Sequence, residues 1–237
     1  MKMRVVLLLS AAVVWACLPT AVADWSDNFD AYANGTQLHG VGGWKGWDND
    51  PNAGAKVTNV QSLSAPHSVD IVGASDLIHP YTGYTSGTWV YTAWQFVPTN
   101  FTGKSYFLLL NRYNDGGPYN WSVQAYADSA TNKFKADMPA GPVAETALIK
   151  GQWVEIRTVI DLTNDKNDLY YNNVLLYTGK SWKKGVFGND VNGVADIATV
   201  DLFANNATSV YYDDMSLVPE PASLLLLALG ALAVRRR

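Results

Sequence analysis

The feature that most constrains the fold is a series of short segments with strand-like alternation and no helical periodicity between them. In "TWVYTAWQFV" (residues 88–97), successive side chains fall on opposite faces, and both faces carry apolar bulk. This pattern indicates a central strand with one face in the core and the other on a concave surface. The remaining segments are "YFLLLN" (106–111), "WSVQAYA" (121–127), "QWVEIRTVIDL" (152–162), "LYYNNVLLYTG" (169–179), "ATVDLFAN" (198–205) and "SVYYDDMSL" (209–217). They predict an all-β fold, an antiparallel two-sheet jelly-roll sandwich, with a tight turn at Asn172-Asn173.

The amino terminus has the layout of a secretory signal peptide. Lys2 and Arg4 precede an apolar stretch from residue 5 to 18, and the small residues 21–23 follow it. We therefore expect residues 1–23 to be a signal peptide, cleaved after Ala23. A lipoprotein site at Cys17 is the alternative, but the bulky Trp15 stands where that signal needs a small residue.

The carboxyl terminus, "VPEPASLLLLALGALAVRRR" (218–237), combines a short apolar run with a basic end. Residues 224–234 are eleven apolar or glycine residues, fewer than the ~20 that a helix needs to cross a bilayer. The prolines before the run keep the chain extended and accessible, and the basic residues after it are expected to stay on the cytoplasmic side. An ordinary tail anchor is the alternative interpretation.

The order of these features resembles the PEP-CTERM sorting signal of Gram-negative bacteria that make exopolysaccharide. The residues that carry the resemblance are Pro219, Glu220, Pro221, Arg235, Arg236 and Arg237. The resemblance implies transient anchoring in the inner membrane through a short helix, and processing by an exosortase, a membrane-embedded sorting protease. It also implies delivery to the envelope surface or extracellular matrix. Residues 24–217 would then be the working domain and residues 218–237 the sorting tail.

The composition of residues 24–217 excludes several functions. Five of the 17 basic residues but only one of the 21 acidic residues lie in the two ends, so the body carries a net charge of about −8. An acidic body argues against nucleic acid as a partner, because nucleic-acid binding needs basic patches. The only cysteine, Cys17, leaves with the signal peptide, so the exported protein can form no disulfide.

The body resembles concanavalin-like and laminin-G-like domains of the lectin and glucanase type. In those domains a Gly-x-Trp strand is followed by a turn and then by a hairpin of the form LYxNGxLL. The matching positions are Gly151, Gln152, Trp153, Tyr170, Asn172, Asn173, Leu175 and Leu176. Asn173 stands where the family usually has glycine. The resemblance implies the sandwich fold, with the first and last strands of the domain paired, more strongly than it implies an activity.

The sequence favours a protein that is not an enzyme. Glycosidases need two carboxylates roughly 5 to 10 Å apart, and the glucanase branch supplies them from a Glu-x-Asp-x-(x)-Glu strand that is missing here. The body has only Glu145 and Glu155, and Arg157 follows Glu155 on the same face, which predicts a surface ion pair. Catalysis by aspartates alone remains open.

Two aromatic loops are candidates for glycan binding. A loop of planar and hydrogen-bonding side chains surrounds a Gly-Gly-Pro turn in "LNRYNDGGPYNWS" (110–122), and "GGWKGWD" (42–48) offers a second platform. The candidates are Trp44, Trp47, Asn111, Tyr113, Asn114, Asp115 and Tyr119. A plain hairpin turn is the alternative for the first loop. No cofactor is required.

A structural calcium ion is a further hypothesis. Alternation in "VYYDDMSL" places Asp213 on the face of its apolar neighbours, where a carboxylate needs a cation or several hydrogen-bond donors. Asp27 and Asp30 would approach Asp213 if the terminal strands pair. Backbone N–H donors at a strand bend are the alternative.

The function predicted from the sequence is a non-catalytic surface or matrix protein that associates with polysaccharide. A purely structural or adhesive matrix component, or a polysaccharide hydrolase or lyase on the same fold, are the alternatives.

Overall fold

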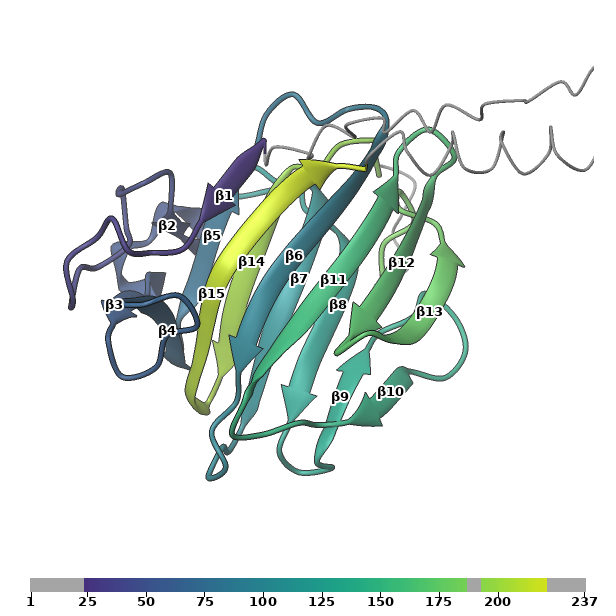
Figure 1. The fold of residues 1–237 in the computed structure, drawn as a ribbon. Coiled ribbons are helices and arrows are strands. Elements are labelled where there is room, and N and C mark those ends of the chain that lie inside the picture. Colours follow the sequence, from purple (N-terminus) through teal and green to yellow (C-terminus); the bar gives the residue numbers. More distant parts are fainter. Residues whose placement is uncertain (1–23, 187–192, 221–237) are drawn as a thin grey trace, which may run out of the picture. The chain divides into compact units, whose positions relative to one another are not determined.

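The alternating segments assemble into two antiparallel sheets that pack face to face in the computed structural model, which describes residues 24–186 and 193–220 (Figure 1). One sheet has eight strands in the order β13-β12-β11-β6-β15-β4-β3, with β1 also paired to β15. Its strands are β1 (Trp25–Asp27), β3 (Lys56–Thr58), β4 (Ser68–Gly73), β6 (Thr88–Phe96), β11 (Trp153–Asp161), β12 (Lys166–Tyr171), β13 (Val174–Lys180) and β15 (Ala207–Pro219).

The second sheet has seven strands in the order β10-β9-β8-β7-β14-β5-β2. Its strands are β2 (Lys45–Gly46), β5 (Asp76–Pro80), β7 (Lys104–Arg112), β8 (Asn120–Asp128), β9 (Lys133–Ala136), β10 (Ala144–Ala147) and β14 (Thr199–Asn205). Two single-turn 3₁₀ helices, η1 (Trp47–Asn49) and η2 (Pro51–Ala53), follow β2. In the described ranges, no helix is both long and apolar enough to span a membrane.

The core lies between the sheets and is made by every second side chain of the central strands. In β6, Tyr91 and Ala93 have no exposed surface, whereas Thr92 and Trp94 on the other face are half-buried. The same period recurs in β7, where Phe107 belongs to the core cluster. The predicted fold class, an all-β sandwich of two antiparallel sheets, is confirmed, and each of the seven predicted segments is a strand or a hairpin.

Local backbone chemistry fixes two of the predicted connections. Asn172 and Asn173 have φ angles of 48° and 61° and form the turn between β12 and β13. The first and last strands pair, with Trp25 opposite Leu217. β15 continues beyond residue 217, because Pro219 lies opposite Trp89 in β6. The domain boundary predicted at residue 217 therefore falls inside a strand.

A β-bulge in β15 corrects one prediction from the alternation. The register against β6 shifts between Asp213 and Ser216, and Asp214 adopts a φ of 42°. Tyr212 and Met215 both face the core, so the strand changes phase between them. Asp213 consequently does not share a face with Met215. It lies opposite Trp94, on the outer side of the sheet.

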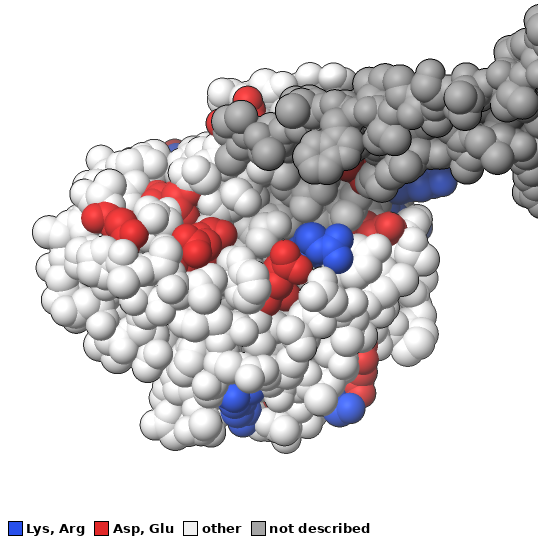
Figure 2. All heavy atoms as spheres, viewed as in Figure 1, with Lys and Arg blue, Asp and Glu red and all other residues white. Residues whose placement is uncertain are grey.

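The predicted signal peptide (1–23) and the apolar part of the predicted tail (221–237) lie outside the described residues. The surface seen in Figure 2 carries separate acidic groups with few basic groups between them. This distribution agrees with the acidic balance of the sequence.

Candidate functional site

The outer face of the seven-stranded sheet carries a groove with a volume of about 610 Å³. The residues that line it are Trp47, Asp76, Tyr106, Leu108, Tyr119, Trp121, Gln124, Asp201 and Phe203. They come from η1, from the end of the β7–β8 loop and from the outward positions of β5, β7, β8 and β14. The groove therefore lies on the sheet opposite to that containing residues 88–97, the segment expected to form a concave surface.

An aromatic wall, defined by Trp47, Tyr113, Tyr119 and Trp121, borders the groove on one side; all of its members except Tyr113, which packs against Trp47, line the groove. The Trp47 ring lies 4.9 Å from Tyr113 and 4.7 Å from Tyr119 between centroids. Trp47 and Trp121 are stacked at 6.0 Å with an interplanar angle of 12°. The Trp47, Tyr119 and Trp121 side chains are half-buried, so part of their ring surface faces solvent at the groove.

Hydrogen bonds tie the two loops that make this wall. Asp48 connects the two loops. Its backbone N–H donates to the Tyr113 hydroxyl at 2.9 Å, and its carboxylate accepts from the Gly116 N–H at 2.9 Å. The Tyr119 hydroxyl also donates to the Asp48 carboxylate. Asp48 has a φ of 52°, a conformation that aspartate tolerates better than most residues. The aromatic wall is thus preorganised.

A salt bridge anchors the far end of the β7–β8 loop. Lys45 Nζ lies 2.7 Å from Asp115, and the Tyr113 hydroxyl donates to the same carboxylate at 2.9 Å. The Lys45 ammonium holds the pKa of Asp115 below its ordinary value. Because both groups remain partly exposed, this pair contributes little stability by itself and mainly fixes the loop.

The opposite wall of the groove comes from strands β7 and β14. Tyr106 and Phe203 face each other across the register at a centroid distance of 5.5 Å. Gln124 of β8 lies between the two walls, and its amide donates to Asp137. Aromatic rings therefore bound the groove on both sides.

Two carboxylic acids form the floor of the groove. Asp76 of β5 lies opposite Phe203, and Asp201 of β14 lies opposite Ile78, so the two acids are diagonal neighbours on the same face. Asp201 donates a hydrogen bond to Asp76. Burial raises the pKa of both acids, to about 6 for Asp76 and well above the ordinary value for Asp201. The two acids therefore titrate as a pair, and the negative charge forms first on Asp76, the acid with the smaller rise in pKa.

The structure joins the two predicted loops into one site. Trp47, Tyr113 and Tyr119 meet in the aromatic wall, although the sequence suggested two separate platforms. Asp115 supports this wall through Lys45, and Asn114 is exposed in the loop and does not line the groove.

Trp44 and Asn111 are corrected from glycan-binding candidates to structural residues. Trp44 has no exposed surface, lies in the core cluster and donates its indole N–H to Asp27 at 2.8 Å. The Asn111 side chain is also fully buried, and its amide donates to Asn120 and to the Trp182 carbonyl. Neither side chain can reach a sugar.

Sequence reasoning missed the floor and the second wall. Alternation in β14 places Asp201 and Phe203 on one face, but nothing in the sequence pairs β14 with β5, which brings Asp76 beside Asp201. Trp121 lies in a predicted strand, and its place in the wall follows from the packing of η1 against β8.

Asp213, the first carboxylate proposed as a calcium ligand, is satisfied by backbone donors. It accepts from the N–H groups of Leu63 at 2.7 Å, Ser64 at 3.2 Å and Asp214 at 2.7 Å. The alternative considered from the sequence, donors at a strand bend, describes this geometry. Burial still raises the pKa of Asp213, to about 7, because desolvation outweighs the three hydrogen bonds.

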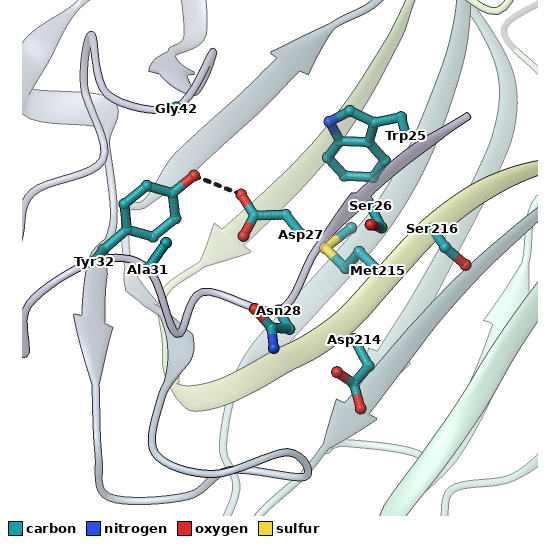
Figure 3. Close-up of a pocket in the computed structure, with 10 residues that line it drawn as sticks. All are labelled: Trp25, Ser26, Asp27, Asn28, Ala31, Tyr32, Gly42, Asp214, Met215 and Ser216. Carbon is teal, nitrogen blue, oxygen red and sulfur yellow. Dashed lines mark hydrogen bonds between the residues drawn. The ribbon is translucent and has the colours of Figure 1, made fainter. Parts of the chain in front are cut away.

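Asp27 and Asp30, the other two proposed ligands, have hydrogen-bond partners of their own. Asp27 lines a polar pocket formed by residues of the paired strands β1 and β15 and of the segment that follows β1, and it accepts from the Tyr32 hydroxyl at 2.8 Å (Figure 3). Asp30 accepts from the N–H of His67 at 2.9 Å. Across the parts of the chain that the structure covers, no group of three or more His, Cys, Asp or Glu residues is placed to hold a metal ion.

Comparison with known proteins identifies the carboxyl terminus. The profile of the PEP-CTERM protein-sorting motif matches residues 217–237. The chain carries a PEP-CTERM motif. This confirms the resemblance seen in the sequence, and the PEP-CTERM motif implies export and sorting to the cell surface. A search of curated proteins gave no match.

Solved structures resemble the domain that precedes the PEP-CTERM motif, and one of them, a sialidase, shares its sandwich fold. A sialidase superposes with a TM-score of 0.54 at 9% identity, over 83% of this chain and 18% of the sialidase. Carbohydrate-binding module CBM66 from Bacillus subtilis gives a TM-score of 0.46 at 13% identity, over 74% of this chain and 95% of the module. Trypanosoma rangeli sialidase in complex with sialic acid gives 0.49 at 10% identity, over 70% and 27%. This chain thus spans about a fifth of the first sialidase, and the likeness concerns the sandwich fold alone.

Proposed function

We propose that this chain is an exported, non-catalytic protein of the cell surface or extracellular matrix that binds polysaccharide through the groove. In this proposal an exosortase processes the tail, which is anchored only transiently in the inner membrane. The observation that carries the proposal is the pair of aromatic walls around a groove of about 610 Å³, a volume typical of ligand sites.

The chemistry of the walls suits sugars. Pyranose rings have apolar C–H faces that stack on aromatic rings, and their hydroxyl groups need polar partners. The groove offers rings from Trp47 and Phe203 on its two sides, and polar groups from Gln124, Asp76 and Asp201 on its floor. A purely structural matrix component would not need such partly exposed rings.

The arrangement of acids supports a non-catalytic role. Glycosidases separate their two carboxyl groups by roughly 5 to 10 Å so that a sugar or water fits between them. Asp76 and Asp201 instead hydrogen bond to each other. Glu155 is also paired, with Arg157 at 3.4 Å, as the sequence predicted.

A polysaccharide pull-down tests this proposal. The protein should sediment with the polysaccharide of its producing cells, and Trp47→Ala should weaken binding about tenfold, which corresponds to ~1.4 kcal/mol. Trp94→Ala is the matched control, because Trp94 is a half-buried tryptophan on the outer face of the other sheet.

Two results would overturn the proposal. Equal binding by wild type and Trp47→Ala would remove the groove as the binding site. Release of reducing sugar from the polysaccharide, lost in Asp76→Asn, would replace binding by hydrolysis.

A further inference from the structure

The acid pair on the groove floor has unused hydrogen-bonding capacity. Asp201 is only 4% exposed and lines the groove together with Asp76. Apart from the hydrogen bond that the two acids share, no donor among the described residues reaches either carboxyl group. A ligand that donates to these carboxyl groups from the groove would satisfy oxygens that are left with few donors.

The groove is acidic, because no basic side chain lines it among the described residues. Asp48 of η1 adds negative charge close to Asp76 and contributes to the raised pKa of that acid. A ligand that carries negative charge would be repelled here, whereas a cation would be attracted.

The basic residues around the groove are already engaged. Lys45 is bound to Asp115 at 2.7 Å, Lys135 is bound to Asp128 at 3.0 Å, and the Lys104 ammonium lies over the Tyr126 ring at 5.4 Å. None of the three lines the groove. The charge of the floor pair is therefore left for a ligand to neutralise.

We propose that the groove recognises polysaccharides with free amino groups, whose ammonium binds Asp76 and Asp201 while the sugar ring stacks between the aromatic walls. This inference rests on the proposed function and names its substrate class, a glucosamine-type glycan. An ammonium group supplies both further hydrogen-bond donors to the two carboxyl groups and the opposite charge, whereas a hydroxyl group supplies only a donor. Uronic acids and sulfated sugars are excluded by repulsion.

Three oligosaccharides of equal length test the proposal by calorimetry with the exported protein at pH 7, above the pKa of Asp76. They are a glucosamine hexamer, its fully N-acetylated counterpart and a galacturonate hexamer. We expect the glucosamine hexamer to bind at least tenfold more tightly than the N-acetylated hexamer, and the galacturonate hexamer to bind weakest. The preference should shrink as salt is raised from 50 to 500 mM.

Two variants test whether the preference for the amino hexamer arises at the acid pair. Asp76→Asn should reduce the tenfold preference to within about threefold, while Glu155→Gln, which removes one carboxylate from the opposite sheet, should keep it. If Asp76→Asn does not fold, as judged by its circular dichroism spectrum, the ligand series on the wild type still decides.

The outcomes separate this inference from the proposed function. Equal affinity for the amino and N-acetylated hexamers, or tighter binding of galacturonate, overturns the amino-sugar inference. The pull-down with Trp47→Ala remains a separate test of whether the groove is the binding site. No binding of any hexamer also overturns the inference. In that case the proposed function also falls if the pull-down of cellular polysaccharide is negative.

Discussion

Asp201 illustrates how one buried residue couples the groove to pH. Its carboxyl group lies diagonally beside that of Asp76 on the groove floor, and burial together with its acidic neighbour raises its pKa. An acid whose pKa is higher in the folded protein than in the unfolded chain stabilises the fold at low pH. That contribution is lost as the pH rises through the folded pKa, which is about 6 for Asp76.

Asp201→Asn should therefore make folding less sensitive to pH. The acid pair should cost the wild-type protein stability as the pH rises from 5 to 8, and the variant should lose less, so that at pH 8 it is more stable than wild type by about 1 kcal/mol or more. Urea unfolding at each pH measures this. Asp213 and Lys180 also titrate in this window, so the comparison is between variant and wild type. If the free energy of unfolding of the variant depends on pH as steeply as that of wild type, Asp76 and Asp201 do not share a proton.

Lys180 is a second buried titratable residue, outside the groove. It is only 6% exposed, its ammonium lies over the Tyr177 ring at 4.5 Å, and Nζ has no hydrogen-bond partner among the described residues. Burial lowers its pKa to about 7. The unfolded chain takes up this proton at a much higher pH, so the folded protein loses stability as the pH falls from about 10.5 to 7.

Lys180→Met keeps the length of the side chain and removes the charge. We expect its free energy of unfolding at pH 7 to exceed that of wild type by at least about 1 kcal/mol, with the difference shrinking toward pH 10. Denaturant melts at the two pH values provide the measurement. Lys166→Met, at an exposed position of β12, should change little. A loss of stability in Lys180→Met would show that the ammonium has a partner that stabilises it.

At the scale of elements, two turns meet at one end of the sandwich and constrain each other. Gly103, in the β6–β7 connection, has a φ of 86°. A Cβ atom added there would overlap the carbonyl oxygen of Asn206, in the β14–β15 turn, and lie 2.7 Å from the Cα of Ala207, the first residue of β15. Only glycine tolerates both the positive φ and the close approach of the neighbouring backbone.

Gly103→Ala should therefore destabilise the domain by roughly 3 kcal/mol, from backbone strain and overlap together. Gly141→Ala is the matched control, because Gly141 has a φ of 85° but no atom within 4 Å of its added Cβ. Its cost should be only about 1 kcal/mol. Thermal unfolding of both variants measures the difference, and equal costs would mean that the two turns do not pack as described.

Elements were predictable where the signal was local. Alternation located β6, β7, β8, β11 and β14, since period-two patterns depend only on neighbouring residues. The bulge at Asp214 was not predictable, because it arises from how β15 pairs with β6. The groove was only half predictable for the same reason. Its loops are rich in aromatic residues, but the meeting of Asp76 with Asp201 depends on strand order.

At the scale of the whole molecule, the sandwich and the sorting tail share a short segment. Pro219 belongs to β15, and the Glu220 N–H donates to the Thr88 carbonyl at 2.9 Å. The profile of the PEP-CTERM motif begins at residue 217. The last strand of the sandwich thus ends within the first residues of the sorting motif.

Truncations on either side of this segment should differ in stability. A chain that ends at Glu220 keeps the β15–β6 pairs to Pro219, whereas one that ends at Leu217 loses the pairs of Val218 with Val90 and of Pro219 with Trp89. We expect the shorter chain to be less stable by about 1 to 2 kcal/mol, since it loses strand hydrogen bonds and packing. Urea melts of the two secreted domains test this, and equal stability would place the functional end of the domain at residue 217.

The arginines at the end of the tail carry the last prediction. The apolar run of residues 224–234 is too short to be held in the bilayer by its length alone, so Arg235, Arg236 and Arg237 are expected to hold its end at the cytoplasmic surface. Replacing all three with serine should let the tail slip from the membrane before an exosortase cleaves it. The protein recovered outside the cell should then keep its tail, and its mass should exceed that of the processed form.

Replacing Lys183 and Lys184 with serine removes basic charge from the folded domain and should leave processing unchanged. Identical masses for wild type and the triple-serine variant would show that the arginines do not retain the tail.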